Sequence, residues 1–235
     1  MRGPLALVGS GEYLPVMADV EAGLLAGRPP RYVQIPTAAA HEGPASLDRW
    51  IALGQQQAER LGVESVPLVV RSRADADDPA LVDQVAEAGL IYLSGGSPTR
   101  LARALAGTAM AAAIEAAWQD GAALAGCSAG AMALTSWVPS LRAPRTEAVQ
   151  GLGVVPHLRV IPHFDQFERR MPEVVTRYLG RAPEGTSVVG VDEETALVWC
   201  DGSWTVQGRR QVWVLSTSGR TGHAAGSEVD LPALV

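Results

Sequence analysis

The segment Gly126–Gly130 has the composition of a turn that can hold a serine nucleophile. It reads Gly-Cys-Ser-Ala-Gly and matches the pattern G-x-S-x-G, between an apolar run and a helix-forming stretch. Such a turn projects the central hydroxyl, here that of Ser128, above a sheet, and the backbone N–H of Ala129 can then stabilise an oxyanion. The pattern therefore predicts acyl transfer on Ser128, and the alternative interpretation is a plain strand-to-helix turn.

Cys127 is a rival nucleophile in the same segment. Thiol enzymes with this kind of turn need cysteine at the central position, and Cys127 stands one residue too early. We therefore expect the Cys127 side chain to point away from the apex of the turn and to pack as a small core residue.

A serine nucleophile needs a general base, and the chain offers four histidines, His41, His157, His163 and His223. His163 directly follows the end of a predicted strand. In open α/β sheets, ligands bind outside the carboxyl ends of the strands, so this position favours His163 as the base. The alternative is a loop histidine with a structural role.

Acidic residues that could orient this base follow another predicted strand. Asp192, Glu193 and Glu194 come directly after the apolar run Val188–Val191, and Asp165 lies close to the favoured histidine in sequence. Neighbouring like charges are costly unless one is paired, so the cluster could be functional, although it could also be a solvated turn. From the residues alone, Asp165, Asp192 and Glu193 all remain candidates.

The pair Gly95-Gly96, followed by Ser97, ends a third apolar run. Glycine lets the backbone approach a ligand closely, so Gly95 is a candidate substrate-binding residue. The N–H of Gly96 is a candidate second oxyanion donor. A simple left-handed turn is the alternative interpretation.

The sequence predicts neither a cofactor site nor a metal site. Gly9-Ser10-Gly11 covers half of a dinucleotide fingerprint but lacks its third glycine and the later acidic residue. The histidines and the two cysteines are scattered, without His-x-x-x-His or Cys-x-x-Cys spacing. We therefore expect chemistry that needs no cofactor and no metal.

The basic residues of the chain narrow the possible mechanisms. All 19 are arginine, and the 235 residues include no asparagine either. The absence of lysine excludes a P-loop NTPase, Schiff-base chemistry and a Ser-Lys dyad. The absence of asparagine excludes a Cys-His-Asn triad. If Ser128 is the nucleophile, a histidine must act as its base.

Charge and hydropathy exclude further classes of protein. A formal charge of −6 without a basic tract argues against a nucleic-acid binder. No apolar run reaches the roughly 18 residues that a membrane span needs. Two cysteines do not make a disulfide framework, so we expect a cytoplasmic protein. With 47% hydrophobic residues, the chain can bury a sizeable core.

Apolar runs alternate with amphipathic segments up to about residue 150. This alternation predicts a three-layer α/β fold of the flavodoxin-like kind, with a mostly parallel sheet and helices on both faces, in a single domain over residues 1–235. The predicted strands are Leu5–Val8, Tyr32–Ile35, Glu64–Val70, Leu90–Leu93 and Ala122–Ala125, and the predicted helices are Pro15–Leu25, Ser46–Leu61, Pro79–Ala88, Pro98–Leu105 and Ala109–Gln119.

The pattern changes in the last third of the chain. Closely spaced apolar runs with Gly-containing turns predict an antiparallel meander at the C-terminal edge of the sheet, and we expect the last twenty residues to be peripheral. The predicted strands here are Leu158–Ile161, Ser187–Val191, Ala196–Cys200, Trp204–Val206 and Gln211–Leu215, with a helix near Glu168–Leu179.

Four segments, taken in order, give the chain a resemblance to a known family. The chain resembles the dipeptidase E / cyanophycinase family of serine peptidases, which has the class I glutamine amidotransferase-like fold. The resemblance covers most of the chain and implies a Ser-His-Glu triad of Ser128, His163 and Glu193 that cleaves an amide bond in a small peptide. The segments that carry it are Leu93–Ser97, Gly126–Ala131, Pro162–Phe164 and Gly190–Ala196.

The chain also departs from this family. Ser97-Pro98 stands where members tend to carry Asn or Asp-Gln, and Ile161 stands where cyanophycinases tend to carry Asp. In the family the residue after the glycine pair helps to fix the substrate, so the resemblance makes Ser97 a candidate substrate-binding residue. Both departures leave the substrate open. Dipeptidase E-like enzymes favour an aspartyl residue at the cleaved bond, which Arg100, Arg169 or Arg170 could recognise by bidentate pairing. Each arginine is alternatively a solvated helix charge.

Two other functions are compatible with these residues. A non-catalytic protein that binds a small molecule or peptide could keep the turn around Ser128 as structure only, because fold does not determine function. An esterase could use the same triad. The expected partner is a small peptide substrate, with neither nucleic acid nor membrane, and a homodimer is compatible with the sequence.

Overall fold

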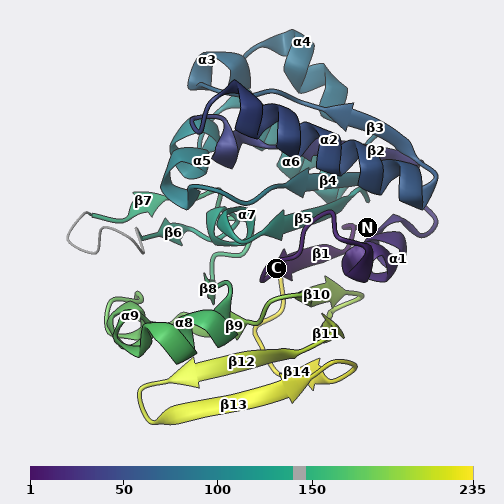
Figure 1. Cartoon of the computed structure of the whole chain (residues 1–235). Helices are drawn as coiled ribbons and strands as arrows, with labels where there is room; N and C mark the ends of the chain where they lie inside the picture. Colours follow the sequence, from purple (N-terminus) through teal and green to yellow (C-terminus); the bar gives the residue numbers. More distant parts are fainter. Residues whose placement is uncertain (140–146, 235) are drawn as a thin grey trace.

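The computed structural model describes residues 1–139 and 147–234, so residues 140–146 and 235 of the predicted domain lie outside the described residues. The described part contains an eight-stranded sheet, a four-stranded sheet and a two-stranded ribbon (Figure 1). The ribbon pairs β6 (Trp137–Val138) with β7 (Val149–Gln150).

The eight-stranded sheet combines a parallel part with an antiparallel edge, in the order β14-β11-β10-β1-β5-β4-β2-β3. Strands β1, β5 and β4 are buried throughout, as expected for parallel strands covered on both faces. The parallel strands are β1 (Leu5–Val8), β5 (Ala123–Cys127), β4 (Leu90–Leu93), β2 (Arg31–Ile35) and β3 (Glu64–Pro67), and the antiparallel ones are β10 (Thr195–Cys200), β11 (Ser203–Gly208) and β14 (Glu228–Val229).

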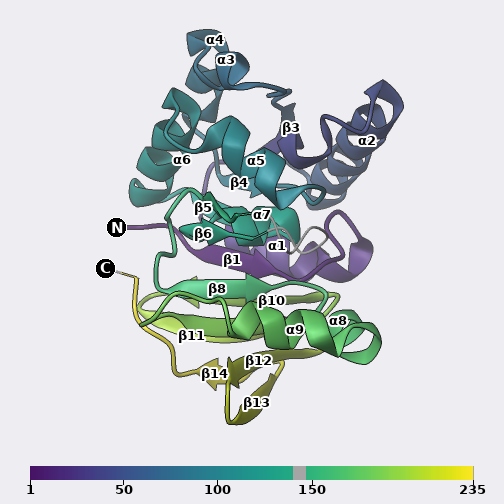
Figure 2. The ribbon, with the colours of Figure 1, turned by 90° about the vertical axis from the view of Figure 1, so that its left-hand side faces the viewer.

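Helices cover both faces of this sheet (Figure 2). Successive residues of β1 show the two faces. Ala6 and Val8 belong to the apolar cluster that includes α1 and α2, whereas Leu5 and Leu7 belong to the cluster that includes α5, α6 and α7. The helices are α1 (Ala18–Leu25), α2 (Pro44–Leu61), α3 (Arg73–Ala76), α4 (Pro79–Val82), α5 (Pro98–Leu105), α6 (Ala109–Gln119) and α7 (Ala129–Ala133).

The register of the central strands brings the predicted functional segments to one edge. Strand β5 lies between β1 and β4, with Val8 opposite Cys127 and Leu93 opposite Gly126. Because the three strands are parallel, their carboxyl ends meet at the same edge of the sheet. The segments after β4 and β5 therefore leave the sheet side by side.

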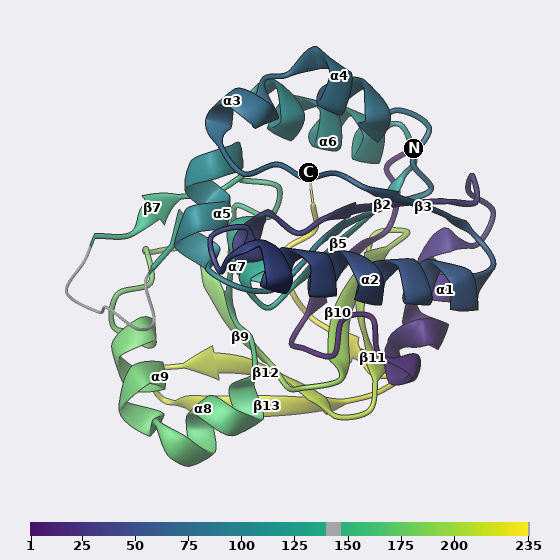
Figure 3. The same ribbon diagram turned by 45° about the horizontal axis from the view of Figure 1, so that its top comes forward.

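A second, four-stranded sheet has the order β13-β12-β9-β8. Helices α8 and α9 lie beside it (Figure 3). Helix α8 approaches β9 so closely that a Cβ built on Gly190 would lie 2.4 Å from the ring of Phe164. The elements are β8 (Leu158–Ile161), α8 (Phe164–Arg170), α9 (Pro172–Leu179), β9 (Ser187–Val191), β12 (Gln211–Ser216) and β13 (Gly219–Ala224).

The predicted α/β fold with a mostly parallel sheet and an antiparallel edge is confirmed, but the single C-terminal meander is wrong in part. Strands β10 and β11 do form the edge of the large sheet, whereas β12 pairs with β9 in the second sheet. The last twenty residues contain β13 and β14, each at the edge of its sheet, so this peripheral segment also contains strands. Short turns separate all these strands, so spacing alone does not show which of them pair.

Several predicted boundaries also move. The helix expected over Glu168–Leu179 is two helices that break at Met171, because the residue before a proline, here Pro172, disfavours the helical conformation. Strand β3 ends three residues before its predicted end, and β5 runs two residues further than predicted. No helix among the described residues is long and apolar enough to cross a membrane.

Candidate active site

Ser128 occupies a strained turn at the carboxyl end of β5. Its φ of 50° and ψ of −104° place a non-glycine residue in a sparsely populated region, at a typical cost of about 1–3 kcal/mol. The Ser128 N–H donates to the carbonyl oxygen of Val8 at 2.9 Å, and the N–H of Met132 donates to the carbonyl oxygen of Ser128 at 3.1 Å. These bonds tie the turn to β1 and to α7.

The two flanking glycines make room for this turn. A Cβ on Gly126 would lie 2.5 Å from the carbonyl carbon of Gly130, and a Cβ on Gly130 would lie 2.2 Å from the carbonyl oxygen of Leu93. In both cases the obstacle is backbone, which cannot rotate away. The glycines of G-x-S-x-G are therefore required by the packing of α7 against β4 and β5.

His163 lies directly over the Ser128 hydroxyl. The residue precedes α8 and has a left-handed backbone, with φ 49° and ψ 38°. Its Nε2 is 3.0 Å from Ser128 Oγ, and its Nδ1 is 3.1 Å from Glu193 Oε1. An ionised carboxylate only accepts hydrogen bonds, so Nδ1 carries the proton and the Nε2 of the neutral ring accepts the Ser128 hydroxyl.

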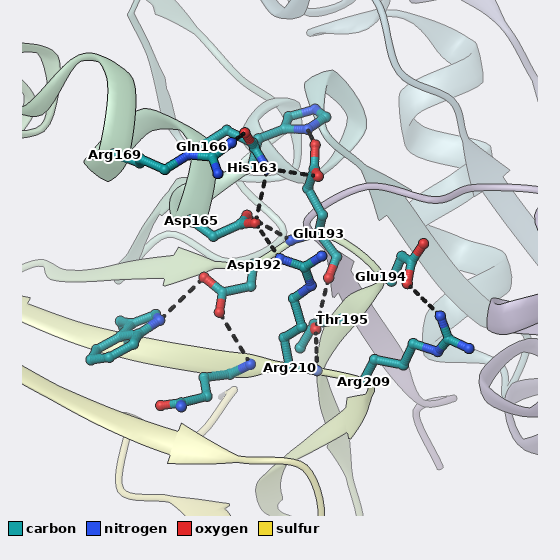
Figure 4. A network of polar contacts seen from close by, with 12 residues as sticks. His163, Asp165, Gln166, Arg169, Asp192, Glu193, Glu194, Thr195, Arg209 and Arg210 are labelled. Atoms are coloured by element: carbon teal, nitrogen blue, oxygen red, sulfur yellow. Dashed lines mark hydrogen bonds and ion pairs between the residues drawn. The ribbon is translucent and has the colours of Figure 1, made fainter.

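Glu193 is itself held by a polar network (Figure 4). Gln166 Nε2 donates to Glu193 Oε2 and to Asp165 Oδ2, each at 3.1 Å. Asp165 accepts the backbone N–H of Glu193 at 3.1 Å and pairs with Arg210 at 2.6 Å. Of the candidate acids, Glu193 therefore contacts the imidazole directly, whereas Asp165 hydrogen-bonds to the backbone of Glu193.

Asp192 points away from His163. Its two carboxylate oxygens accept the indole N–H of Trp213 at 3.2 Å and the backbone N–H of Gln211 at 3.3 Å, both from β12 (Figure 4). Burial raises the pKa of Asp192, although these two hydrogen bonds oppose the shift. Asp192 therefore anchors the second sheet and does not contact the imidazole.

A pocket of about 330 Å³ opens over Ser128 and His163. Gly96, Ser97 and Ala129 line it, and neither the Gly96 N–H nor the Ala129 N–H donates to another described residue. Both donors are thus available beside the hydroxyl. Gly96 has a φ of 134°, and a Cβ there would lie 2.6 Å from the Ala38 carbonyl carbon. Each of these two facts favours glycine at this position.

Glu12 contributes hydrogen bonds to the site, and sequence reasoning missed it. Its carboxylate accepts the backbone N–H of Gly95 at 2.9 Å and the thiol of Cys127 at 2.8 Å. The Gly95 N–H therefore points to Glu12 beneath the pocket instead of toward a substrate. Cys127 is fully buried and points away from the apex, and burial raises the pKa of its thiol well above the ordinary value. One feature of the sequence could have indicated Glu12: it is a charged residue shortly after β1, at the edge of the sheet where β4 and β5 also end.

Of the remaining candidates, two line pockets and one lies behind the acid. His41 lines the pocket over Ser128, whereas Arg100 lines a neighbouring pocket. Arg169 is exposed and donates to Gln166 Oε1 at 2.7 Å (Figure 4), so it supports the network behind Glu193. Gln166 is a second residue that sequence reasoning missed, because its contact depends on how α8 packs. Among the described residues, no cluster of His, Cys, Asp or Glu could hold a metal ion.

Comparison with known proteins identifies the family. The family model described as Peptidase family S51 matches residues 5–207. The chain belongs to peptidase family S51. This confirms the predicted relationship to the dipeptidase E / cyanophycinase peptidases.

Individual relatives within or near family S51 agree with this placement. Cyanophycinases from Synechococcus elongatus and from Thermosynechococcus vestitus (strain NIES-2133 / IAM M-273 / BP-1) are each 30% identical to the chain over 165 residues. That alignment covers 66% of this chain and 50% of each relative, so the chain spans about half the length of these curated relatives. The crystal structure of a peptidase from an acI-B1 Actinobacterium is 42% identical, with a TM-score of 0.91 over 98% of both chains.

Proposed function

We propose that the chain is a serine peptidase that hydrolyses an amide bond in a small peptide through an acyl-enzyme on Ser128. The observation that carries the proposal is the continuous contact from the Ser128 hydroxyl through His163 to Glu193, at a strained turn beside a pocket. Membership of a peptidase family supports it independently.

In the first half of the proposed reaction, Ser128 Oγ attacks the scissile carbonyl while His163 Nε2 takes the hydroxyl proton. Glu193 holds the ring with Nδ1–H toward it and stabilises the positive charge that develops. The N–H groups of Gly96 and Ala129 donate to the oxyanion. His163 then passes its proton to the leaving amine, and the acyl group stays on Ser128.

In the second half, water enters where the amine has left. His163 takes a proton from this water, the hydroxide attacks the acyl carbonyl, and the proton returns to Ser128 Oγ as the ester bond breaks. All proton transfers in the two halves run among Ser128, His163, the leaving amine and water, so this mechanism needs no cofactor and no metal. Ser97, which lines the pocket, is a proposed substrate contact.

Gly95, Arg100 and Arg169 take more distant parts in the proposal. Gly95 positions the backbone of Gly96 through its bond to Glu12, and Arg169 supports Gln166 behind the acid. Arg100 faces a pocket beside the proposed catalytic one. A cytoplasmic location and a homodimer remain finer predictions from the sequence.

A fluorophosphonate probe combined with peptide hydrolysis tests this function. We expect the probe to label Ser128, and Ser128→Ala to lose both labelling and hydrolysis, the latter by about 10⁴-fold or more. Cys127→Ala is the matched control, because the buried thiol points away from the pocket; it should retain labelling and most activity. Peptide hydrolysis that survives Ser128→Ala would refute the mechanism.

A further inference from the structure

A second pocket, of about 590 Å³, opens beside the one over Ser128. The two pockets share His41 and Thr99 in their linings, so they lie next to each other at these residues. A peptide bound over Ser128 therefore has the second pocket beside it. We call it the arginine pocket, because Arg71, Arg100 and Arg103 line it.

The charges in the arginine pocket are unbalanced. The three guanidinium groups face a single carboxylate in the described lining, that of Glu147. Arg100 and Arg103 are three residues apart on α5, which makes them neighbours on one face of the helix, where like charges repel. Within the described residues, neither of them forms an ion pair with an acid. A bound anion would relieve this repulsion.

The walls of the pocket are tied to each other. The turn that carries Arg71 is closed by Asp75, which accepts the Arg71 N–H at 2.8 Å, and by a capping box between Ser72 and Asp75. Arg73 in the same turn donates to the carbonyl oxygens of Arg103 at 3.2 Å and Ala106 at 2.7 Å. Arg73 therefore has a structural role and links the turn to α5, on the opposite wall.

A buried hydroxyl is the second, independent observation. Thr37 lines the arginine pocket and is only 4% exposed, and its Oγ1 has no hydrogen-bond partner among the described residues. Buried polar groups without partners are rare in folded proteins. The wall that the three arginines line thus also contains a neutral hydroxyl without a partner.

We propose that the arginine pocket binds a carboxylate of the peptide substrate at a position remote from the cleaved bond. That the ligand is a substrate rests on the proposed function. The protein has a formal charge of −6, so most of its surface repels acidic peptides. A local cluster of guanidinium groups is where an acidic peptide would be attracted instead. The carboxylate comes either from an acidic side chain or from the free C-terminus of a short peptide.

Isothermal titration of the Ser128→Ala protein tests the proposal, because this protein leaves peptides intact. The probes are tetra-alanine peptides with Asp or Asn at one position, each made with a free and with an amidated C-terminus. We expect at least one acidic peptide to bind about fivefold to tenfold more tightly than its matched amide, with a difference that shrinks between 50 and 500 mM NaCl. The position of the preference separates the two sources of the carboxylate.

Substitution of the arginines localises the preference. In the Ser128→Ala background, Arg100→Gln with Arg103→Gln should bring the ratio of acid to amide affinity close to one. Arg49→Gln is the matched control, since Arg49 is an exposed arginine of α2 that lines neither pocket, and it should keep the ratio.

Two results would overturn the inference: no acid-over-amide preference at any position, or a preference that survives the double substitution. Both are binding measurements, so they do not depend on whether wild-type protein cleaves any peptide. A chain that fails to hydrolyse peptides but keeps the arginine-dependent preference would refute the proposed function and leave the pocket assignment standing.

Discussion

At the residue scale, two of the six described non-glycine residues with positive φ are proposed catalytic residues. Ser128 and His163 both have φ near 50°, a conformation that non-glycine residues adopt at a typical cost of about 1–3 kcal/mol each. In each case the strain directs a side chain: the hydroxyl of Ser128 above β5, and the ring of His163 over that hydroxyl. The fold thus maintains an unfavourable backbone where the contact between the two side chains requires it.

The sequence predicts these side chains to different degrees. Ser128 can be placed because its neighbours have a required spacing, and His163 because it follows a strand end. The choice among Asp165, Asp192 and Glu193 cannot be made from residue types, because adjacent acids differ only in the direction of their side chains. Family resemblance favoured Glu193, which is the acid that contacts the ring.

Substitution of the acids tests their separate roles. Glu193→Gln keeps the shape but removes the charge that holds His163 Nδ1–H, so we expect kcat to fall by about 10²- to 10⁴-fold. Asp192→Asn is the matched control: its contacts are with Trp213 and Gln211, and kcat should stay within about tenfold of wild type. Steady-state kinetics of the two variants checks this, and equal losses would contradict the assignment.

At the element scale, helix α8 lies between His163 and a break in the helical segment at Met171. Pro172 ends α8 at Arg170, and α8 begins directly after His163. The proline is visible in the sequence, but the helix predicted over Glu168–Leu179 runs through it. The start of α8 at Phe164, four residues before the predicted start, depends instead on packing of the Phe164 ring over Gly190, which involves a strand more than twenty residues away.

Two glycine-to-alanine substitutions in helices should have opposite effects. In α7, the Cβ of Gly130→Ala would lie 2.2 Å from the Leu93 carbonyl oxygen, so α7 must move away from β4. We expect a loss of about 1–3 kcal/mol in the free energy of unfolding, together with lower activity as Ser128 shifts. In α1, Gly23→Ala meets nothing within 4 Å and should stabilise the protein by about 0.5–1 kcal/mol.

Urea unfolding of both glycine variants, alongside peptide hydrolysis, measures these effects. The comparison controls for intrinsic helix propensity, because propensity alone would make both substitutions stabilising. If Gly130→Ala were as stable as wild type, the close approach of α7 to β4 would not be a required feature of the turn.

At the scale of the whole molecule, the site is assembled across two sheets. Ser128 follows β5 of the eight-stranded sheet, whereas His163 and Glu193 follow β8 and β9 of the four-stranded one. We infer that residues 1–235 act as a single domain, because neither sheet holds the proposed triad alone. The alternating pattern up to about residue 150 predicts the parallel part of the first sheet, but the second sheet depends on pairings between strands that spacing does not specify.

The stability of the whole molecule depends on the protonation of a carboxyl group buried beside the large sheet. Glu21 of α1 is 1% exposed, and its Oε2 accepts the hydroxyl of Tyr32 at 2.9 Å. The rings of Tyr13, Tyr32 and Tyr92 pack against one another beside it. Burial raises the pKa of Glu21 to about 7, above the value of about 4.3 expected in the unfolded chain.

The sign of the effect on stability follows from this shift. The folded state favours protonated Glu21, so the stability contributed by this proton is fully present below about pH 4. It is lost as the pH rises through 7, by roughly 4 kcal/mol in total. Glu21→Gln stays neutral and can still accept the Tyr32 hydroxyl. We therefore expect the variant to equal wild type near pH 4.5 and to be increasingly more stable than wild type up to pH 8. Urea unfolding midpoints at pH 4.5, 6, 7 and 8 measure the difference in stability. Glu59→Gln is the control, because Glu59 is exposed. A difference that does not grow with pH would show that Glu21 is ionised at little cost in the folded protein.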